Sequence, residues 1–270
     1  MSSTTEAAIR THWTKPPFVR SPWLRWGINI AVLAYVLVAV RTFDINIERI
    51  IVGLERGYQI LLAFFRPDFA SRGRWILRGV LESLTMTLTA TTAGVSLSVL
   101  ITLGAARNIS PLPVYLLCRG ILIVVRSLHV VVFAILFVVM IGFGPLAGAI
   151  TLALNSIGFI GKIMAEEIEN IDEDTLEAIR STGASWPQLV AYGVWPQITT
   201  RFVGVAIYQL DINFRQSTII GLVGAGGIGS VLDTAMGRYD YNTATAILIV
   251  IIALVLVGEY VSSAIRRRLT

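Results

Sequence analysis

The sequence predicts an all-α integral membrane protein with about six transmembrane helices. Of its 270 residues, 55% are hydrophobic and 14% are charged, whereas soluble domains carry about 25% charged residues. The mean hydropathy is +0.73, so too few polar side chains remain to cover the surface of a soluble fold. The apolar residues also gather into runs of roughly 20, the length that a helix needs to cross a bilayer.

Six segments are long and apolar enough to be such spans. They cover residues 23–40, 79–103, 114–141, 145–163, 197–223 and 241–264. Basic residues precede the first, as in a signal peptide, but no A-x-A cleavage site follows, so we expect a retained membrane anchor. Ala90, Gly94 and Ser98 lie four residues apart in the second, a spacing of small residues that lets helices approach closely.

The positively charged ends predict the orientation in the membrane. Arg266, Arg267 and Arg268 directly follow the last segment, and basic residues are enriched on the cytoplasmic side. With six spans, both termini and the loop 164–196 then lie in the cytoplasm. The chain divides on this basis into residues 1–77, with a cytoplasmic tail, the first span and an amphipathic segment, and residues 78–270, a core of five spans.

The segment between the first two spans runs against this rule. Residues 41–78 contain seven arginines and four acids and would lie on the outer side. Within them, apolar residues recur at helical spacing at Ile50, Leu54, Tyr58, Leu61, Leu62 and Phe65. The pattern predicts a helix that either lies in the plane of the membrane interface or packs on the spans.

Several kinds of chemistry are excluded. The single cysteine, Cys118, excludes an internal disulfide and, with only two histidines, a Cys/His zinc cluster. The sequence has no G-x-x-x-x-G-K-[ST] motif and no cluster of a nucleophile with a base, so neither an ATPase nor another enzyme is predicted. Metal and nucleic-acid sites are not expected.

The hexapeptide GAGGIG, residues 224–229, matches the G-x-G-x-x-G fingerprint of dinucleotide-binding proteins. No βαβ alternation surrounds it, and Leu248 stands about where an acidic residue should hold the ribose. We therefore reject that function. We interpret Gly224, Gly226, Gly227 and Gly229 as a flexible or gating loop at the membrane edge.

Charged and polar residues inside the spans indicate a candidate polar pathway, because an ionisable group there costs at least about 2.5–3.5 kcal/mol. Asp211 and Arg215 are four residues apart and share a helix face, as either a self-neutralising pair or groups that line a pathway. The other candidates are Asn213, Arg126 and His129. For His129 a hydrogen bond between helices is the favoured alternative, and Arg126 can extend to the cytoplasmic surface.

The stretch EAIRSTGASWPQLVAYGVWP, residues 177–196, resembles a known family. Glu177 and Ala178, then Gly183, then Pro196 reproduce the spacing of the EAA loop in membrane subunits of ATP-binding-cassette importers. The departures are Ile179, Gly193 and Trp195, where the family has Ala, Ile and Leu.

Two further stretches resemble the phosphonate-type permeases of this superfamily. They are GFGPLAGAITLALNSIGFIGKIMAEEIENID, residues 142–172, and NFRQSTIIGLVGAGGIG, residues 213–229. The resemblance covers the chain from about residue 119 to the C-terminus. In VRSLHVV the chain departs from the pattern, since Leu128, His129 and Val130 stand where a proline and often an acid are expected.

The resemblance implies a type I importer permease (MetI-like) fold in the bacterial inner membrane, with a cytoplasmic coupling helix. It implies a homodimer that is driven by two separate ATPase subunits, which hold ATP and Mg²⁺, and is supplied by an extracytoplasmic solute-binding protein. This chain itself would bind no cofactor. The implied substrate is a phosphonate or a related phosphorus oxyanion, such as phosphate or phosphite, whose oxygens Arg215 and Arg126 can pair with bidentately. The alternatives are a permease for methionine or another small solute, and an ion-coupled transporter that uses Asp211.

The resemblance also implies a contact with the ATPase through Glu177, Ala178, Gly183, Trp186 and Pro196. The residues fit a rigid helix–turn–helix: Asp172 or Asp174 can cap its first helix, Gly183 permits a tight bend, and Pro187 suits the first turn of its second helix. We expect Leu176, Ile179 and Leu189 to be apolar anchors and Pro196 to end the piece. A bulky residue at Gly183 is expected to uncouple ATP hydrolysis from transport.

Overall fold

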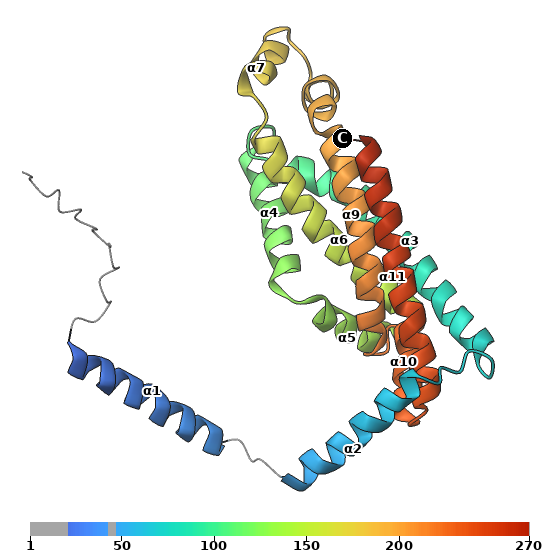
Figure 1. Cartoon of the computed structure of the whole chain (residues 1–270). Helices are drawn as coiled ribbons and strands as arrows, with labels where there is room; N and C mark the ends of the chain where they lie inside the picture. Colours follow the sequence, from blue (N-terminus) through green and yellow to red (C-terminus); the bar gives the residue numbers. More distant parts are fainter. Residues whose placement is uncertain (1–20, 43–46, 270) are drawn as a thin grey trace, which may run out of the picture. The chain divides into compact units, whose positions relative to one another are not determined.

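The computed structural model describes residues 21–42 and 47–269, and these ranges are almost entirely helical (Figure 1). The elements are α1 (Pro22–Thr42), α2 (Ile47–Phe64), α3 (Gly73–Ala105), α4 (Leu112–Ser127), α5 (Val130–Ile141), α6 (Pro145–Glu169), α7 (Glu173–Ser181), α8 (Trp186–Gln188), the π-helix η1 (Leu189–Val194), α9 (Trp195–Gly221), α10 (Gly227–Gly237) and α11 (Tyr241–Leu269). By their contacts, residues 1–56 and 57–270 form two compact units. The functional division at residue 77 stays a prediction.

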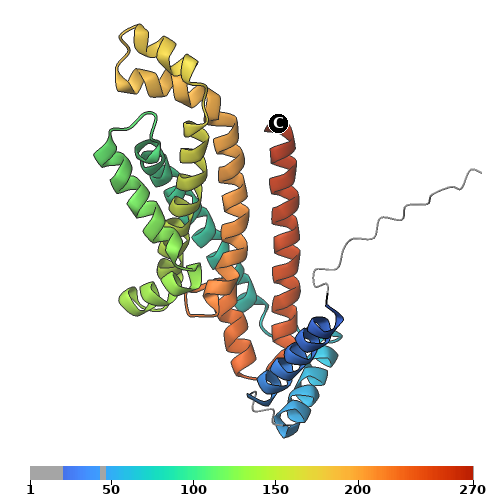
Figure 2. The same cartoon turned by 90° about the vertical axis from the view of Figure 1, so that its left-hand side faces the viewer.

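The second unit is a helix bundle. Its most extensive contact joins α3 to α6, and α9 packs against both of them and against α11 (Figure 2). A Cβ atom on Gly94 of α3 would lie 2.5 Å from Cβ of Ser156 in α6, and Ala90 and Ser98 are buried on the same helix. The prediction that these small residues mediate close helix packing is confirmed.

The predicted spans are all helical. Four helices, α1, α3, α6 and α11, are long and apolar enough to cross a membrane, and α4 with α5 adds a fifth if the bent pair counts as one span. The remaining predicted segment, residues 197–223, is α9, whose 27 residues give a length of about 40 Å but include Asp211 and Arg215. The all-α class is confirmed, and these helices are consistent with about six spans.

The third predicted span, residues 114–141, is a bent pair of helices and not one continuous helix. Helices α4 and α5 are bent by 92° around Leu128 and His129, which have extended backbone with ψ of 143° and 146°. His129 Nδ1 accepts the Val131 N–H at 3.4 Å, which satisfies one of the free N–H groups at the start of α5. The sequence gives no local signal for this bend, because neither proline nor glycine stands at that point.

Helix α2 confirms the helix predicted from apolar periodicity. Its residues at that spacing, Ile50, Leu54, Tyr58, Leu61 and Leu62, have exposed side chains, and so does Phe65, which directly follows the helix. An exposed apolar face of this kind suits contact with lipid. Placement of α2 in the plane of the membrane interface stays a prediction.

Candidate functional site

The candidate coupling segment forms a helical hairpin at one end of the bundle (Figure 1). The carboxylate of Asp172 accepts the Asp174 N–H at 3.2 Å and caps α7. Gly183 turns the chain with φ of +78°, a conformation that favours glycine. Pro187 lies in the first turn of α8, as predicted. We call residues 173–194 the coupling hairpin.

Pro196 does not end this hairpin, which corrects the prediction made from its sequence. It lies in the first turn of α9, a position where proline is common. The π-helix η1 precedes it, and Trp195 N–H donates to Val190 O across that wider turn. The helical path therefore runs without a break from the hairpin into α9.

The predicted apolar anchors attach the hairpin to this chain's own core, where Leu176 and Leu189 are buried and Ile179 is partly buried against them. They pack there with Ile168 of α6 and Ile198 of α9. The predicted contact residues Glu177, Ala178, Gly183, Trp186 and Pro196 are exposed. The aromatic surface of the segment comes from Trp186, Tyr192 and Trp195, which are 48%, 74% and 37% exposed.

Two departures from the family pattern compensate for each other. A Cβ atom on Gly193 would lie 3.0 Å from Cδ1 of Ile179 and 3.2 Å from Cδ2 of Leu176. The larger residue at position 179 therefore fills the space next to the smaller residue at position 193. This exchange keeps the hairpin closed, so the departures do not weaken the assignment of the loop.

The α3–α4 loop holds the hairpin through two backbone carbonyl groups. Arg180 of α7 donates from Nη2 to Asn108 O at 2.6 Å, and Trp186 of α8 donates from Nε1 to Ile109 O at 2.9 Å. Consecutive residues of one loop thus accept hydrogen bonds from both arms of the hairpin. We call these four residues the loop clamp. Sequence reasoning missed Arg180 and Asn108, because a backbone acceptor leaves no pattern in the sequence.

The same loop is fixed to the membrane helices. Asn108 Nδ2 donates to Ile168 O at 2.7 Å. The Glu169 carboxylate accepts the Arg107 N–H at 2.9 Å and Arg119 Nη2 at 2.7 Å, and such charge-assisted bonds are among the stronger ones. The hairpin therefore contacts α3 and α4 through this loop, in addition to its packing on α6 and α9.

Gly183→Val is expected to lower coupled uptake roughly tenfold, whereas Gly183→Asn retains most of it. A Cβ atom at Gly183 meets no atom within 4 Å, so the cost is conformational: about 1–2 kcal/mol for an ordinary residue with positive φ, or roughly tenfold. Asparagine tolerates this conformation and β-branched residues do not. Uptake per ATP hydrolysed in reconstituted vesicles measures the effect. Full coupled uptake by Gly183→Val and Gly183→Trp would show that this bend has no part in coupling.

Asp211 and Arg215 of α9 form the ion pair that their spacing predicts. The Asp211 side chain is 4% exposed and that of Arg215 is 47% exposed. A cavity of about 230 Å³, lined mostly by apolar residues of α3, α9 and α11, adjoins Asp211. The pair neutralises a carboxylate inside the bundle and leaves about half of the arginine accessible.

Asn213 lies in a buried polar network instead of beside this pair. Its Nδ2 donates to Thr91 Oγ1 and to Ser156 Oγ at 2.8 Å each, and its Oδ1 accepts from Gln209 Nε2 at 2.8 Å. All four residues are buried, so the network ties α3, α6 and α9 together. Gln209 could have been found from its position one helical turn before Asn213; Thr91 and Ser156 carry no such signal.

Arg126 and His129 lie at the bend between α4 and α5. Arg126 is in the last turn of α4, His129 precedes α5, and both are exposed. The hydrogen bond between helices that was expected for His129 is not found in the described part of the chain, because Nδ1 accepts the nearby Val131 N–H. A pathway role for these residues, and for Asn213, stays a prediction.

The glycine loop packs closely on the turn between α5 and α6. Gly224, Gly226 and Gly227 have φ of +90°, +80° and +73°, and Gly144 N–H donates to Gly224 O at 3.1 Å. A Cβ atom on Gly226 would lie 2.7 Å from the nitrogen of Pro145, closer than van der Waals contact allows. Backbone conformation and lack of space thus both require glycine here, while the gating role stays a prediction. Over residues 21–42 and 47–269, no three His, Cys, Asp or Glu side chains gather to hold a metal ion.

Similar sequences come from transport proteins. Residues 94–270 match the family described as binding-protein-dependent transport system inner membrane component. A phosphite transport system permease protein of Stutzerimonas stutzeri is 40% identical over 202 residues, which cover 74% of this chain and 73% of that protein. A phosphate-import permease protein of Mycolicibacterium smegmatis is 34% identical over 246 residues, which cover 91% of this chain and 46% of that protein.

Solved structures share the fold. An inward-facing methionine ATP-binding-cassette transporter superposes with a TM-score of 0.64 at 24% identity, covering 74% of this chain and 99% of the other. An amino acid ATP-binding-cassette transporter gives a TM-score of 0.61 at 22% identity, covering 74% and 98%. With residues 94–270 matched in sequence, the chain belongs to the inner membrane components of binding-protein-dependent transport systems and is a permease subunit of an ATP-binding-cassette importer, not an enzyme.

Proposed function

We propose that two copies of this chain form the translocation pathway of an importer for a phosphorus oxyanion such as phosphite, phosphonate or phosphate. A permease of this family works with ATPase subunits and a solute-binding protein, and we assign ATP and Mg²⁺ to the ATPase. One observation carries the substrate: three relatives that match 74% to 91% of this chain at 31% to 40% identity are named as phosphite or phosphate permeases.

The coupling hairpin is the proposed contact with the ATPase. Its buried face, with Leu176 and Leu189, joins the chain's own core, and its exposed face presents Glu177, Ala178 and Trp186 at the end of the bundle. The hydrogen bonds of the loop clamp attach the hairpin to α3 and α4, and its buried face attaches it to α6 and α9. The same proposal places the loop 164–196 and both chain termini in the cytoplasm.

Methionine is the second candidate substrate. A probable D-methionine permease of Vibrio cholerae and a methionine import permease of Bacillus subtilis match at 24% and 23% identity over 46% and 54% of this chain. These likenesses are weaker and shorter than those of the phosphite and phosphate permeases. An oxyanion is therefore the favoured substrate.

Reconstitution tests both the substrate and the energy source. The chain is placed in vesicles with its ATPase and solute-binding protein, and uptake of phosphite, a phosphonate, phosphate and methionine is compared. ATP-dependent uptake of an oxyanion supports the proposal. Uptake of methionine in place of the oxyanions would show that methionine is the substrate. Uptake that collapses with the proton gradient but survives loss of the ATPase would contradict the mechanism.

Arg215→Ala is expected to lower oxyanion uptake more than it lowers assembly, because its guanidinium group is suited to bind phosphate-like oxygens. The single change also leaves Asp211 as an unpaired buried carboxylate, which costs about 3–5 kcal/mol. The double variant Asp211→Asn, Arg215→Ala removes that penalty and isolates the contact with substrate. Uptake is measured beside the yield of assembled transporter. Recovery of full uptake by the double variant would show that Arg215 only neutralises Asp211.

A further inference from the structure

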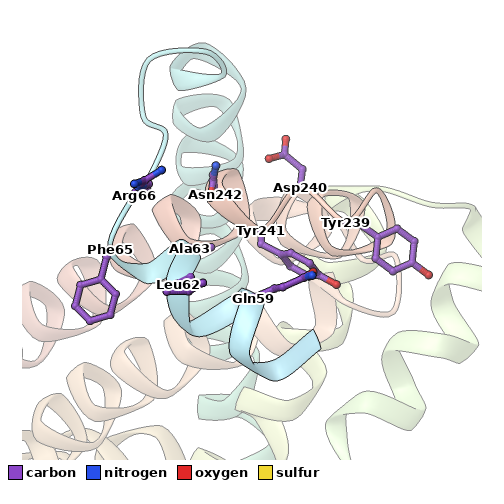
Figure 3. Close-up of a pocket in the computed structure, with 9 residues that line it drawn as sticks. All are labelled: Gln59, Leu62, Ala63, Phe65, Arg66, Tyr239, Asp240, Tyr241 and Asn242. Carbon is purple, nitrogen blue, oxygen red and sulfur yellow. The ribbon is translucent and has the colours of Figure 1, made fainter. Parts of the chain in front are cut away.

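A second candidate site lies at the end of the bundle opposite the coupling hairpin. A pocket of about 650 Å³ opens there between the end of α2 and the turn that joins α10 to α11 (Figure 3). Its lining comes entirely from residues 59–66 and 239–242, within the second compact unit. The proposed transport function uses none of these residues.

The walls of the pocket are held in place by hydrogen bonds and an ion pair. Asp68 N–H donates to Asn242 O at 3.2 Å, which ties the chain after α2 to the start of α11. The Asp68 carboxylate accepts the Ala70 and Ser71 N–H groups at 3.0 Å, and hydrogen bonds from Ser71 hold the pKa of Asp68 below its usual range. Arg72 pairs with Asp240 at 3.6 Å. The pocket is thus a formed feature of the fold.

The lining holds polar side chains that have no hydrogen-bond partner within the described part of the protein. The side chains of Gln59, Arg66 and Asn242 and the hydroxyl groups of Tyr239 and Tyr241 make no hydrogen bond or ion pair within residues 21–42 and 47–269. Asp240 is neutralised by Arg72, so Arg66 contributes the remaining charge. A pocket with one free guanidinium group and several neutral donors suits an anion with oxygen ligands.

Tyr239 adds an independent observation. It has φ of +58° and is the non-glycine residue with positive φ in the described structure. It follows the end of α10, where glycine is the usual residue because a side chain in this conformation is disfavoured. Its side chain is 66% exposed, and its ring makes a T-shaped contact with the ring of Tyr241 at 6.3 Å between centroids, so the two tyrosines form one polar wall of the pocket.

The location of the pocket identifies the kind of anion. Helices α3 and α11, both long and apolar enough to cross a membrane, begin at Gly73 and Tyr241, so the pocket lies beside the ends of two candidate spans. Its rim carries the exposed apolar side chains of Leu62 and Phe65. Tyrosine and arginine are the residues that anchor proteins at the headgroup level. An apolar rim beside a cationic, polar interior matches the two halves of a phospholipid.

We propose that this pocket binds the phosphodiester headgroup of a membrane phospholipid. Arg66 receives the phosphate, the hydroxyl groups of Tyr239 and Tyr241, which lie across the pocket from Arg66 (Figure 3), face the polar remainder of the headgroup, and the acyl chains leave past Leu62 and Phe65. The bound lipid joins α2 to the α10–α11 turn.

The test uses the assembled transporter, purified in detergent, stripped of lipid and titrated with phosphatidylglycerol, with bound phospholipid counted by native mass spectrometry. Arg66→Gln is expected to weaken binding about tenfold, as for loss of one charge-assisted hydrogen bond. Tyr239→Gly relieves the backbone conformation, so it is expected to keep or raise the melting temperature while weakening lipid binding. Arg74→Gln, at an exposed arginine of the same end that does not line the pocket, serves as the control.

Three results would overturn the proposal. If Arg66→Gln and Arg74→Gln weaken lipid binding equally, the binding depends on general surface charge and not on a specific site. Inorganic phosphate that displaces the lipid and binds as tightly by itself would indicate a site for the free oxyanion. Unchanged lipid binding in Arg66→Gln, with reduced stimulation of ATP hydrolysis by the solute-binding protein, would indicate a protein-docking surface.

Discussion

The double variant Arg180→Gln, Trp186→Phe is expected to lower coupled uptake at least about tenfold while the transporter still assembles. It removes the hydrogen bonds to Asn108 O and Ile109 O and keeps much of the volume of both side chains. The hairpin stays attached to the core through Leu176 and Leu189, but its movement no longer reaches α3 and α4 directly. ATP hydrolysis therefore continues with less transport for each ATP, and uptake per ATP hydrolysed is the quantity to measure.

Arg107→Gln is the matched control for this variant. It removes a positive charge from the same loop, and its backbone N–H still bonds Glu169, so normal coupling is expected. Comparison of Trp186→Phe with Trp186→Ala separates two roles, because phenylalanine keeps an aromatic surface and lacks the N–H donor. Normal coupling in the double variant, or a defect confined to Trp186→Ala, would rule out the loop clamp as the transmitting contact.

Asn213→Leu is expected to lower the free energy of unfolding by about 2–4 kcal/mol. The change leaves Gln209, Ser156 and Thr91 without their shared partner in a buried contact between three helices. The melting temperature of the purified protein and the yield of assembled transporter measure the loss.

Ser217→Ala is the control for the buried network. Ser217 is also buried in α9, but its hydroxyl group donates to Phe214 O of the same helix, so its loss affects no other element and little change is expected. If Asn213→Leu is as stable as Ser217→Ala, the network does not hold the helices together. If it is stable and transport is lost, the pathway role predicted for Asn213 gains support.

The fold was accessible from the sequence because bilayer thickness imposes a strong and simple constraint on composition. Runs of apolar residues identify the spans, and the Glu177, Gly183 and Pro196 spacing identifies the hairpin. The bend at His129 escaped this reasoning, since a capped interruption of two residues leaves hydropathy unchanged. Hydropathy also misses the polar ends of helices: α6 continues to Glu169, beyond the apolar run that ends at residue 163.

The site was less accessible, for three physical reasons. Leu176 and Leu189 are apolar in an amphipathic segment, and periodicity alone does not say whether such a face meets a partner or the chain's own core. The loop clamp uses backbone carbonyl groups, which every residue has. Asn213 and Asp211 are two residues apart on one helix and so point in different directions, one into a network and one toward an ion pair.

The exchange of size between positions 179 and 193 makes these two positions epistatic. Restoring the family's isoleucine at Gly193 alone would force a side chain against Ile179 and Leu176, and restoring alanine at Ile179 alone would leave a void beside a glycine. Either reversion alone is therefore expected to be harmful, although each restores a residue of the family pattern that the loop resembles. Engineering toward a family consensus in this hairpin must change the two positions as a pair, and an evolutionary route between the two solutions has to pass through a less stable intermediate.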